Sequence, residues 1–407
     1  MTTLFLDERF YLFLAAAIVL QRWLAPRFGP DARAALLAAV SLFFLSRLQN
    51  AATFLPLQLA YAGVLAAAGL VLARLPAGSA RRVLFLAGLA GCLLLLVLVK
   101  YPGMTESLAG RRDWLAALAA LPWAGLSYTT FRAVDLLLQA RSGRLPACRP
   151  LQVLAYLLFF PAFTAGPINR FRPFLADLET GPSPMPWERL RGNLLRLGFG
   201  LVKILVLGRL AYLNAIVSPG FDELLPAPGW RLALGLYWYY LYIYLDFSGY
   251  CDAAIAIADC LGIRLPENFR WPVLAANLQD FWNRWHISLS HWCRDYVFFP
   301  LNLTFVSRWR LGGLSATCLA AMTTFLLIGL WHGDAWHWLG YGAWHGLGVA
   351  GHALYNHGLA RRWPNPIARL RANPLYRILC VVLTFNYVSW GLLLTLPPAR
   401  LARLFLP

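Results

Sequence analysis

Charged side chains are scarce in this 407-residue chain. They make up 13% of the residues, whereas soluble globular proteins contain about 25%. Hydrophobic residues account for 59%, and the mean hydropathy is +0.57. This composition argues against a soluble globular protein, and no polar basic face that could bind nucleic acid is visible. The 36 basic residues outnumber the 18 acidic ones, an excess typical of cytoplasmic loops and of contacts with anionic membrane lipid.

The apolar residues form long runs that recur along the whole chain. Because a bilayer span needs about 20 apolar residues, the runs predict an all-α, multi-pass membrane protein with roughly 11 transmembrane segments. They indicate a single domain over 1–407. Residues 264–313 contain no run of span length and predict short helices at the membrane interface. The apolar runs cover 10–21, 34–46, 54–73, 83–99, 114–138, 151–165, 193–217, 228–262, 314–331, 335–356 and 377–397.

Several enzyme motifs are missing. The seven cysteines are scattered without a CxxC pair, so neither a zinc site nor a disulfide framework is predicted. There is no HExxH motif, no Gly-x-Ser-x-Gly elbow and no P-loop. We therefore expect no bound cofactor and no metal, and direct transfer to an acceptor hydroxyl is favoured over a covalent enzyme intermediate. A haem held by histidines on separate helices stays open as an alternative.

Histidine is absent from the first 285 residues, and all seven histidines lie between His286 and His357. An even distribution along the chain would place about one histidine between residues 286 and 357. His332 ends an apolar run and precedes Gly333 and Asp334, so it could accept a proton from a hydroxyl nucleophile. The alternative is a histidine that bonds a backbone carbonyl at a helix end. His286 lies in a polar, aromatic segment. It could be a second proton handler or a hydrogen-bond partner of the substrate, and the alternative is an interfacial structural residue.

The remaining histidines are weaker candidates. His345 and His352 are seven residues apart and share one helix face. Gly342 and Gly346 predict that this helix packs closely against a neighbour, although His345 could point into a cavity. Three others are predicted to be interfacial: His291, His337 and His357. The close pairs His286/His291 and His332/His337 are five residues apart, which is a poor spacing for two metal ligands on one helix face.

Two carboxylates flank a glycine within an apolar span. Asp246 and Asp252 lie on either side of Gly249, and ionisable groups at membrane depth are functional candidates by default. They could orient a base or relay ions. Ion pairing with arginines across the bundle is the favoured interpretation.

These residues fall within motifs by which the chain resembles the membrane-bound O-acyltransferases, in the bacterial branch that D-alanylates teichoic acid and O-acetylates alginate. The resemblance implies a ring of tilted helices around a central tunnel. It also implies that His332 is the catalytic residue and His286 the second invariant histidine of the branch. The motifs follow in family order over about 120–346: Leu121–Phe131, Phe160–Arg170, Asp246–Asp252, Pro266–Phe269, Phe281–Ser290, Arg294–Tyr296, Gly329–Gly333 and Trp344–Gly346.

The resemblance further implies an O-acyltransferase in the bacterial cytoplasmic membrane. A cytoplasmic thioester donor, on an acyl-carrier protein or coenzyme A, would supply a D-alanyl or acetyl group. The acceptor would be a hydroxyl of a cell-envelope glycopolymer or of an extracytoplasmic accessory protein. Asn283, Arg284 or tryptophan N–H groups could stabilise the oxyanion. The full set of expected supporting or substrate-binding residues is Asn283, Arg284, Trp285, Trp331, Asp295, His345 and Asp246.

A transporter or channel for a small solute is the alternative. Broken helices and buried Asp and Arg side chains would then line a translocation path. Such proteins commonly contain two related halves, and no internal repeat is visible in this chain.

Overall fold

The computed structural model describes residues 8–24, 27, 29–48, 51–101, 123–181, 185–223 and 228–405. Within these residues the chain is helical, apart from an isolated antiparallel bridge between Phe269 and Trp285. The predicted all-α fold class is therefore confirmed. The chain divides into two compact units, Met1–Ile204 with Gly249–Pro266 and Leu205–Ser248 with Glu267–Pro407. That residues 1–407 act as one domain stays a prediction.

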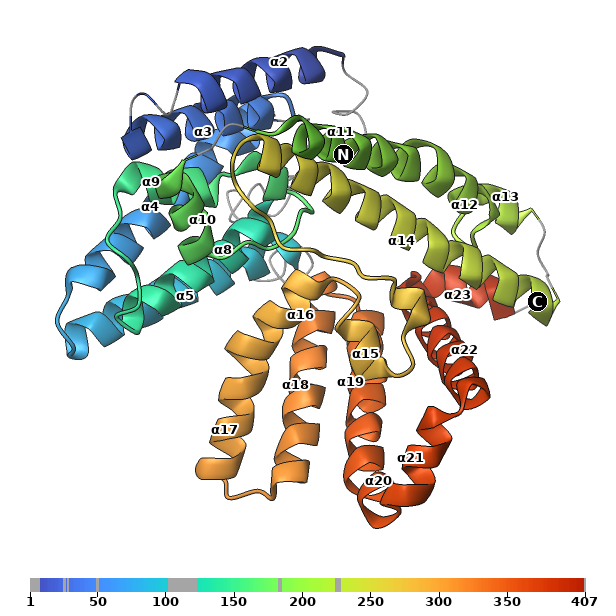
Figure 1. The fold of residues 1–407 in the computed structure, drawn as a ribbon. Coiled ribbons are helices and arrows are strands. Elements are labelled where there is room, and N and C mark those ends of the chain that lie inside the picture. Colours follow the sequence, from blue (N-terminus) through green and yellow to red (C-terminus); the bar gives the residue numbers. More distant parts are fainter. Residues whose placement is uncertain are drawn as a thin grey trace, which may run out of the picture. The chain divides into compact units, whose positions relative to one another are not determined.

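The first unit is organised around α8 (Leu126–Arg141), in which 12 of 16 residues are buried. Helices α4 (Ala51–Arg74) and α5 (Ser79–Lys100) pack against it (Figure 1). At Gly69 of α4 a Cβ atom would lie 2.8 Å from Leu136, so the closeness of α4 and α8 requires a small residue there. The other helices of this unit are α2 (Glu8–Val19), η1 (Leu20–Leu24), α3 (Gly29–Ser46), α9 (Pro150–Leu157), η3 (Phe160–Ala162), α10 (Phe171–Thr180), α11 (Trp187–Val202) and η4 (Lys203–Leu207), the last of which ends beyond it.

Helix α14 (Gly229–Cys260) contributes to both units, because residues 229–248 belong to the second and 249–260 to the first. In the first unit it packs against α11. A Cβ atom on Gly249 would lie 2.6 Å from the carbonyl oxygen of Gly200, and one on Gly200 would lie 2.7 Å from that of Gly249. Gly249 therefore serves a backbone-to-backbone contact.

The second unit is built on the antiparallel pair α18 (Gly313–His332) and α19 (Trp336–His357) (Figure 1). A Cβ atom on Gly342 would lie 2.4 Å from the carbonyl oxygen of Phe325, and one on Gly346 would lie 2.9 Å from the sulfur of Met322. The predicted close packing of this helix is confirmed. The other helices are α12 (Gly208–Asn214), α13 (Pro219–Asp222), η5 (Pro272–Leu274), α15 (Leu278–Trp282), α16 (Ile287–Cys293), η6 (Arg294–Phe298), α17 (Phe299–Ser307), α20 (Leu359–Arg362), α21 (Pro364–Ala372), α22 (Pro374–Gly391), η7 (Leu392–Thr395) and α23 (Pro398–Phe405).

Six helical segments are long and apolar enough to cross a membrane, so the chain is a multi-pass membrane protein. The count of roughly 11 is not confirmed. The run over 151–165 makes only the eight-residue α9 and a 3₁₀ turn, because Pro161 and the following Gly166 interrupt it. The first part of the run over 114–138 lies outside the described residues. The six segments are Gly29–Ser46, Ala51–Arg74, Ser79–Lys100, Trp187–Asp222, Gly313–His332 and Pro374–Thr395.

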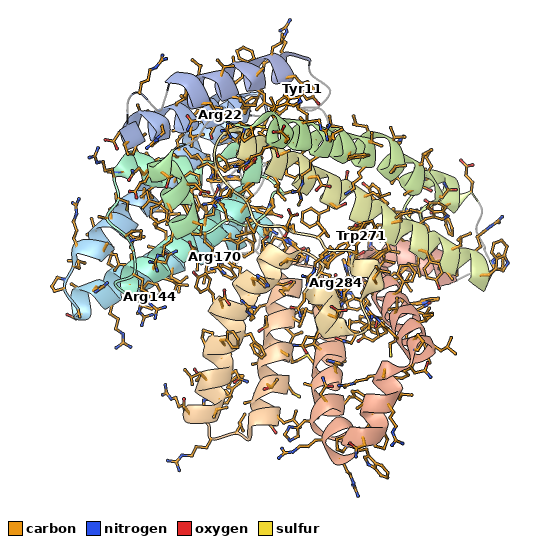
Figure 2. All side chains as sticks on the ribbon, viewed as in Figure 1. Tyr11, Arg22, Arg144, Arg170, Trp271 and Arg284 are labelled. Atoms are coloured by element: carbon orange, nitrogen blue, oxygen red, sulfur yellow. The ribbon has the colours of Figure 1, made fainter. Side chains whose placement is uncertain are left out.

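Between these spans, residues 264–313 form the short helices α15, α16 and α17 joined by tight turns, as predicted. In the sequence, Trp271 precedes α15 and Arg284 follows it; both residues are labelled in Figure 2. The turn before α15 is held by Asn277, whose side chain accepts a hydrogen bond from the backbone N–H of Asp280 at 2.8 Å. An asparagine N-cap of this kind satisfies a helix donor that would otherwise lack a partner. The segment that carries His286 is thereby fixed by local bonds.

Candidate active site

His332 is the last residue of α18 and has an exposed side chain. Its ring lies 4.9 Å from the indole of Trp338 and nearly parallel to it, at 16°. Trp331 and Tyr341 contact it at 4.7 and 5.9 Å between ring centroids. The long apolar run ends here because Gly333 and Asp334 follow. An imidazole is thus presented at a helix end, on a platform of aromatic rings.

His286 is placed by a strained backbone. It precedes α16 with φ 45° and ψ 51°, the left-handed region that non-glycine residues rarely adopt. The backbone N–H of Ile287 donates to the carbonyl oxygen of Asn268 at 3.0 Å, and the antiparallel bridge between Phe269 and Trp285 holds the same turn. Strain of this kind persists where the surroundings over-determine it and clusters at functional sites.

Asn268 fixes the tautomer of His286. The amide oxygen of Asn268 accepts hydrogen bonds from the backbone N–H of Ser288 at 3.0 Å and from its hydroxyl at 2.8 Å. Since a backbone N–H can only donate, this atom is the oxygen and not the nitrogen of the amide. The Nδ1 atom of His286, 3.2 Å away, must therefore carry a proton and donate it. Nε2 is then the basic atom of the ring.

Burial controls the charge of His286. The side chain is 6% exposed and its ring meets that of Phe247 edge-on at 4.7 Å. Loss of hydration, followed by the nearby charge of His332, lowers the pKa of His286 to about 3. The ring is therefore neutral at physiological pH.

His345 lies inside α19 and is completely buried. Its ring is surrounded by Trp282 at 5.1 Å, Tyr341 at 4.6 Å and more distant rings of Phe281, Phe325 and Tyr387. Neither ring nitrogen has a hydrogen-bond partner among the described residues. Tyr341 contacts both His345 and His332. The structure thus connects the two histidines through one tyrosine ring.

Other histidines have structural surroundings. The Nδ1 atom of His337 lies 2.9 Å from the carbonyl oxygen of Leu394, and the side chain is 5% exposed. His337 is therefore buried, whereas an interfacial position was predicted. His352 contacts Asn356 through Nε2 at 2.9 Å. His357 is exposed at the end of α19, and exposed His291 lines a cavity. In the described part of the chain, no group of three or more His, Cys, Asp or Glu side chains is arranged to hold a metal ion.

The predicted oxyanion residues, Asn283 and Arg284, directly follow α15. Arg284 donates from Nε to Asp280 at 2.7 Å. Asn283 is exposed and lines a cavity of about 270 Å³ together with Trp282, Ser290 and His291. Within the described residues neither Asn283 nor Arg284 hydrogen-bonds to His286 or His332. Their adjacency to His286 in the sequence does not bring their polar groups onto its ring.

Three further expected residues differ in their contacts. Trp285 stacks on Phe281 at 5.6 Å and 17°, which positions the turn before His286. Asp295 accepts a hydrogen bond from Arg294 at 3.0 Å on the surface. Asp246 has no ion-pair partner in the described part of the chain. Asn268, by contrast, was not singled out, although it stands in a motif that carries the family resemblance.

The carboxylates of the first unit are paired. Asp252 binds Arg196 at 2.9 Å and Lys203 at 2.6 Å, which confirms the favoured interpretation for this residue. Asp135 accepts from Arg170 at 3.3 Å and from the backbone N–H of Phe171 at 2.9 Å. These groups form internal ion pairs within that unit.

Comparison with known proteins identifies the family. The model of the membrane-bound O-acyltransferase family matches residues 91–389. Teichoic acid D-alanyltransferase of Bacillus subtilis is 33% identical over 274 residues, which cover 66% of this chain and 67% of that protein. The Streptococcus thermophilus protein of the same name is 33% identical, with 56% of each chain covered. A probable alginate O-acetylase of Pseudomonas syringae is 32% identical over 56% of this chain and 42% of its own length. The matches thus span between 42% and 67% of the lengths of these relatives.

Proposed function

Because the chain belongs to the membrane-bound O-acyltransferase family, we propose that it transfers an acyl group from a thioester to a hydroxyl, with His332 as general base. The observation that carries this proposal is the exposed imidazole at the end of α18, held by Trp331, Trp338 and Tyr341. A base must be accessible to the reacting hydroxyl and fixed in direction. The aromatic rings supply the direction without burying the ring.

In the proposed reaction, His332 takes the proton of the acceptor hydroxyl as its oxygen attacks the thioester carbonyl. The new C–O bond forms, the C–S bond breaks, and the proton passes to the departing thiolate, so ester and thiol are the products. The thioester already carries an activated acyl group, which leaves positioning and proton transfer as the work of the protein.

His286 is proposed to orient the acceptor. Its Nδ1–H is committed to Asn268, so Nε2 offers a lone pair to a hydroxyl donor. A pKa of about 3 keeps the ring neutral, which makes it a hydrogen-bond acceptor and a poor competitor for the transferred proton. The two histidines would then divide the task, with one directing the hydroxyl and the other deprotonating it.

The remaining site residues are proposed in supporting roles. Trp331 lies against His332, and its indole N–H is our candidate donor to the oxyanion. His345 supports His332 through Tyr341. Asn283, Arg284, Trp285, Asp295 and Asp246 are proposed to shape the substrate path around these groups.

The donor and acceptor are inferred from the relatives. One relative is named for D-alanyl transfer to teichoic acid and another for alginate acetylation. We therefore propose D-alanyl or acetyl as the acyl group, an acyl-carrier protein or coenzyme A as the cytoplasmic donor, and an envelope glycopolymer or an extracytoplasmic accessory protein as the acceptor. The cytoplasmic membrane is the proposed location.

The test compares envelopes of cells that carry the wild type, His332→Ala, or no copy of the chain. Esters released by mild alkali are identified and counted by mass spectrometry. We expect His332→Ala to match the deletion while its membrane abundance equals that of the wild type. Released alanine would indicate D-alanyl transfer, and released acetate would indicate acetyl transfer.

His357→Ala is the matched control, because this exposed histidine ends the same helix hairpin away from the aromatic platform. It should retain full ester content. Wild-type ester content in cells with only His332→Ala would contradict the role of His332. Unchanged esters in the deletion, together with lost accumulation of a solute, would instead favour the transporter alternative.

A further inference from the structure

One end of the second unit carries positive charge without acidic neighbours in the chain. No Asp or Glu occurs over 296–333 or anywhere after Asp334. Exposed arginines gather at the turn between α17 and α18 and on the short helices α20 and α21, and they have no ion-pair partner among the described residues. We call them the basic end: Arg308, Arg310, Arg361, Arg362 and Arg369.

A groove lies beside the α17–α18 turn. Its volume is about 640 Å³, and residues from the start of α18 and the end of α19 line it. Polar lining is supplied by Ser315, Thr317 and Asn356. Arg371 of α21 donates to the amide oxygen of Asn356 at 2.6 Å, so α21 is tied to the wall of the groove. The α17–α18 turn and α20 lie at the same end of the α18–α19 hairpin (Figure 1).

This end lies where spans leave the hydrocarbon. Helix α18 is a candidate span that begins at Gly313, and the span of α22 begins at Pro374, directly after α21. Two tryptophans flank the groove segments, Trp309 at 58% and Trp363 at 55% exposure. Exposed tryptophans beside arginines at span ends are typical of the membrane–water interface. The groove is therefore at the depth of lipid headgroups.

We propose that this groove and the basic end bind the headgroup of an anionic phospholipid. Guanidinium groups form paired hydrogen bonds with phosphate oxygens, and the arginines lack an internal carboxylate that would compete. The exposed hydroxyl of Ser315 offers a hydrogen bond to a headgroup hydroxyl. Exposed Leu354 of α19 provides an apolar surface beside the groove for an acyl chain. An acidic protein would match the charge, but it would leave the tryptophans and leucines without a partner.

The site is distinct from the acyl-transfer chemistry. Its residues lie at the start of α18, whereas His332 is the last residue of that 20-residue helix. A helix of this length spans about 30 Å. Lipid binding can therefore be measured on the full chain without any acyl donor or acceptor, and its outcome is independent of the proposed function.

The experiment uses the full-length protein, purified in detergent and stripped of lipid. Native mass spectrometry measures the retention of added phosphatidylglycerol and phosphatidylcholine. The wild type should prefer phosphatidylglycerol. The triple variant Arg361→Gln, Arg362→Gln and Arg369→Gln should bind phosphatidylglycerol about tenfold more weakly, because each arginine near an anionic surface adds to the attraction. Its binding of phosphatidylcholine should not change.

The matched control removes three exposed arginines from the first unit: Arg47→Gln, Arg74→Gln and Arg82→Gln. It subtracts the same net charge and should keep the preference for phosphatidylglycerol. An equal loss in both triple variants would overturn the proposal, since the effect would then be one of net charge. Displacement of the lipid by millimolar inorganic phosphate would also overturn it, as the site would then bind free anions.

Two further measurements protect the result. Should the triple variant misfold, the single variant Arg362→Gln carries the test, and unchanged phosphatidylglycerol retention would contradict the proposal. In vesicles of phosphatidylcholine alone, an acidic carrier protein that binds the wild type but not the triple variant would assign this surface to a protein. A phosphatidylglycerol requirement for the thermal stability of the wild type alone would support the lipid.

Discussion

Two carboxylates of the first unit and two histidines of the second unit have contrasting surroundings. In the first unit, Asp135 is satisfied by Arg170 and Phe171 and Asp252 by Arg196 and Lys203. In the second, His332 sits on aromatic rings and His345 has no hydrogen-bond partner in the described part of the chain.

This difference separates scaffold from chemistry. A buried polar group without a partner costs about 1–3 kcal/mol, so it is not retained for stability. A paired group holds the fold but is not available to a substrate. The contrast predicts that substitutions of these carboxylates reduce folding, whereas substitutions of His332 and His345 reduce activity at little or no cost in folding.

The largest effect on folding is expected from Asp135→Ala. Arg170 would lose its carboxylate, and the N–H of Phe171 and the hydroxyl of Tyr156 would lose an acceptor. Breaking a buried pair on one side costs about 3–5 kcal/mol. We expect a steep drop in the amount of folded protein, measured by size-exclusion chromatography after detergent extraction. Normal yield with lost activity would place Asp135 with the chemistry and break the comparison.

A large effect on activity per folded molecule is expected from Asn268→Ala. The variant removes the acceptor that holds Nδ1–H of His286 and both donors of Ser288. His286 could then adopt either tautomer, and we expect activity to fall about 10²-fold, in the range that a misplaced proton-handling group costs. The measurement is ester formation in isolated membranes, normalised to protein amount.

Asn268→Asp tests the role of Asn268 through the pH dependence of activity. An aspartate still accepts all three hydrogen bonds, but its charge raises the pKa of His286 from about 3. A raised pKa means that the ring becomes protonated at higher pH. Activity should therefore approach the wild type at alkaline pH and fall earlier as pH decreases. An acid limb identical to that of the wild type would contradict a requirement for neutral His286.

Two buried histidines of α19 give a matched pair. His345→Phe removes two ring nitrogens without partners and should leave thermal stability equal or higher, while activity falls. His337→Phe leaves the carbonyl oxygen of Leu394 without its ring partner and should lower stability by about 1–3 kcal/mol with activity per folded molecule retained. Thermal denaturation and acyl transfer are measured on both variants. The same sign of stability change in both would remove the distinction between them.

The candidate site was partly predictable from the sequence. The apolar run before His332 and the glycine after it indicated a helix end, and the structure has one there. Gly342 and Gly346 indicated tight packing, which occurs. The environment of His286 was not predictable, because its anchor Asn268 lies 18 residues away and only the turn at φ 45° brings the two together. Short-range patterns carry no signal for such a contact.

Residues next to each other in sequence were also misleading. Asn283 and Arg284 lie just before His286 in the sequence. Arg284, however, pairs with Asp280 of α15, four residues before Arg284. An i,i+4 partner on the same helix face competes with any longer-range role. Pro161 likewise ended a run that hydropathy alone counts as a span. A hydropathy value averaged over a window does not register a single proline that ends a helix.

The smallest effect is expected from an exposed ion pair of the first unit. Arg264 binds Asp177, but its side chain is 75% exposed, and such pairs contribute about 0–1 kcal/mol. Arg264→Gln should therefore leave both yield and activity within error of the wild type, whereas Asp177→Ala, at a 6% exposed carboxylate that also accepts from the backbone N–H of Arg264, should lower thermal stability. If Arg264→Gln were as damaging as Asp177→Ala, the stabilising term would be the surface charge pair and not the buried acceptor. That result would contradict the view that burial decides which polar groups stabilise the first unit.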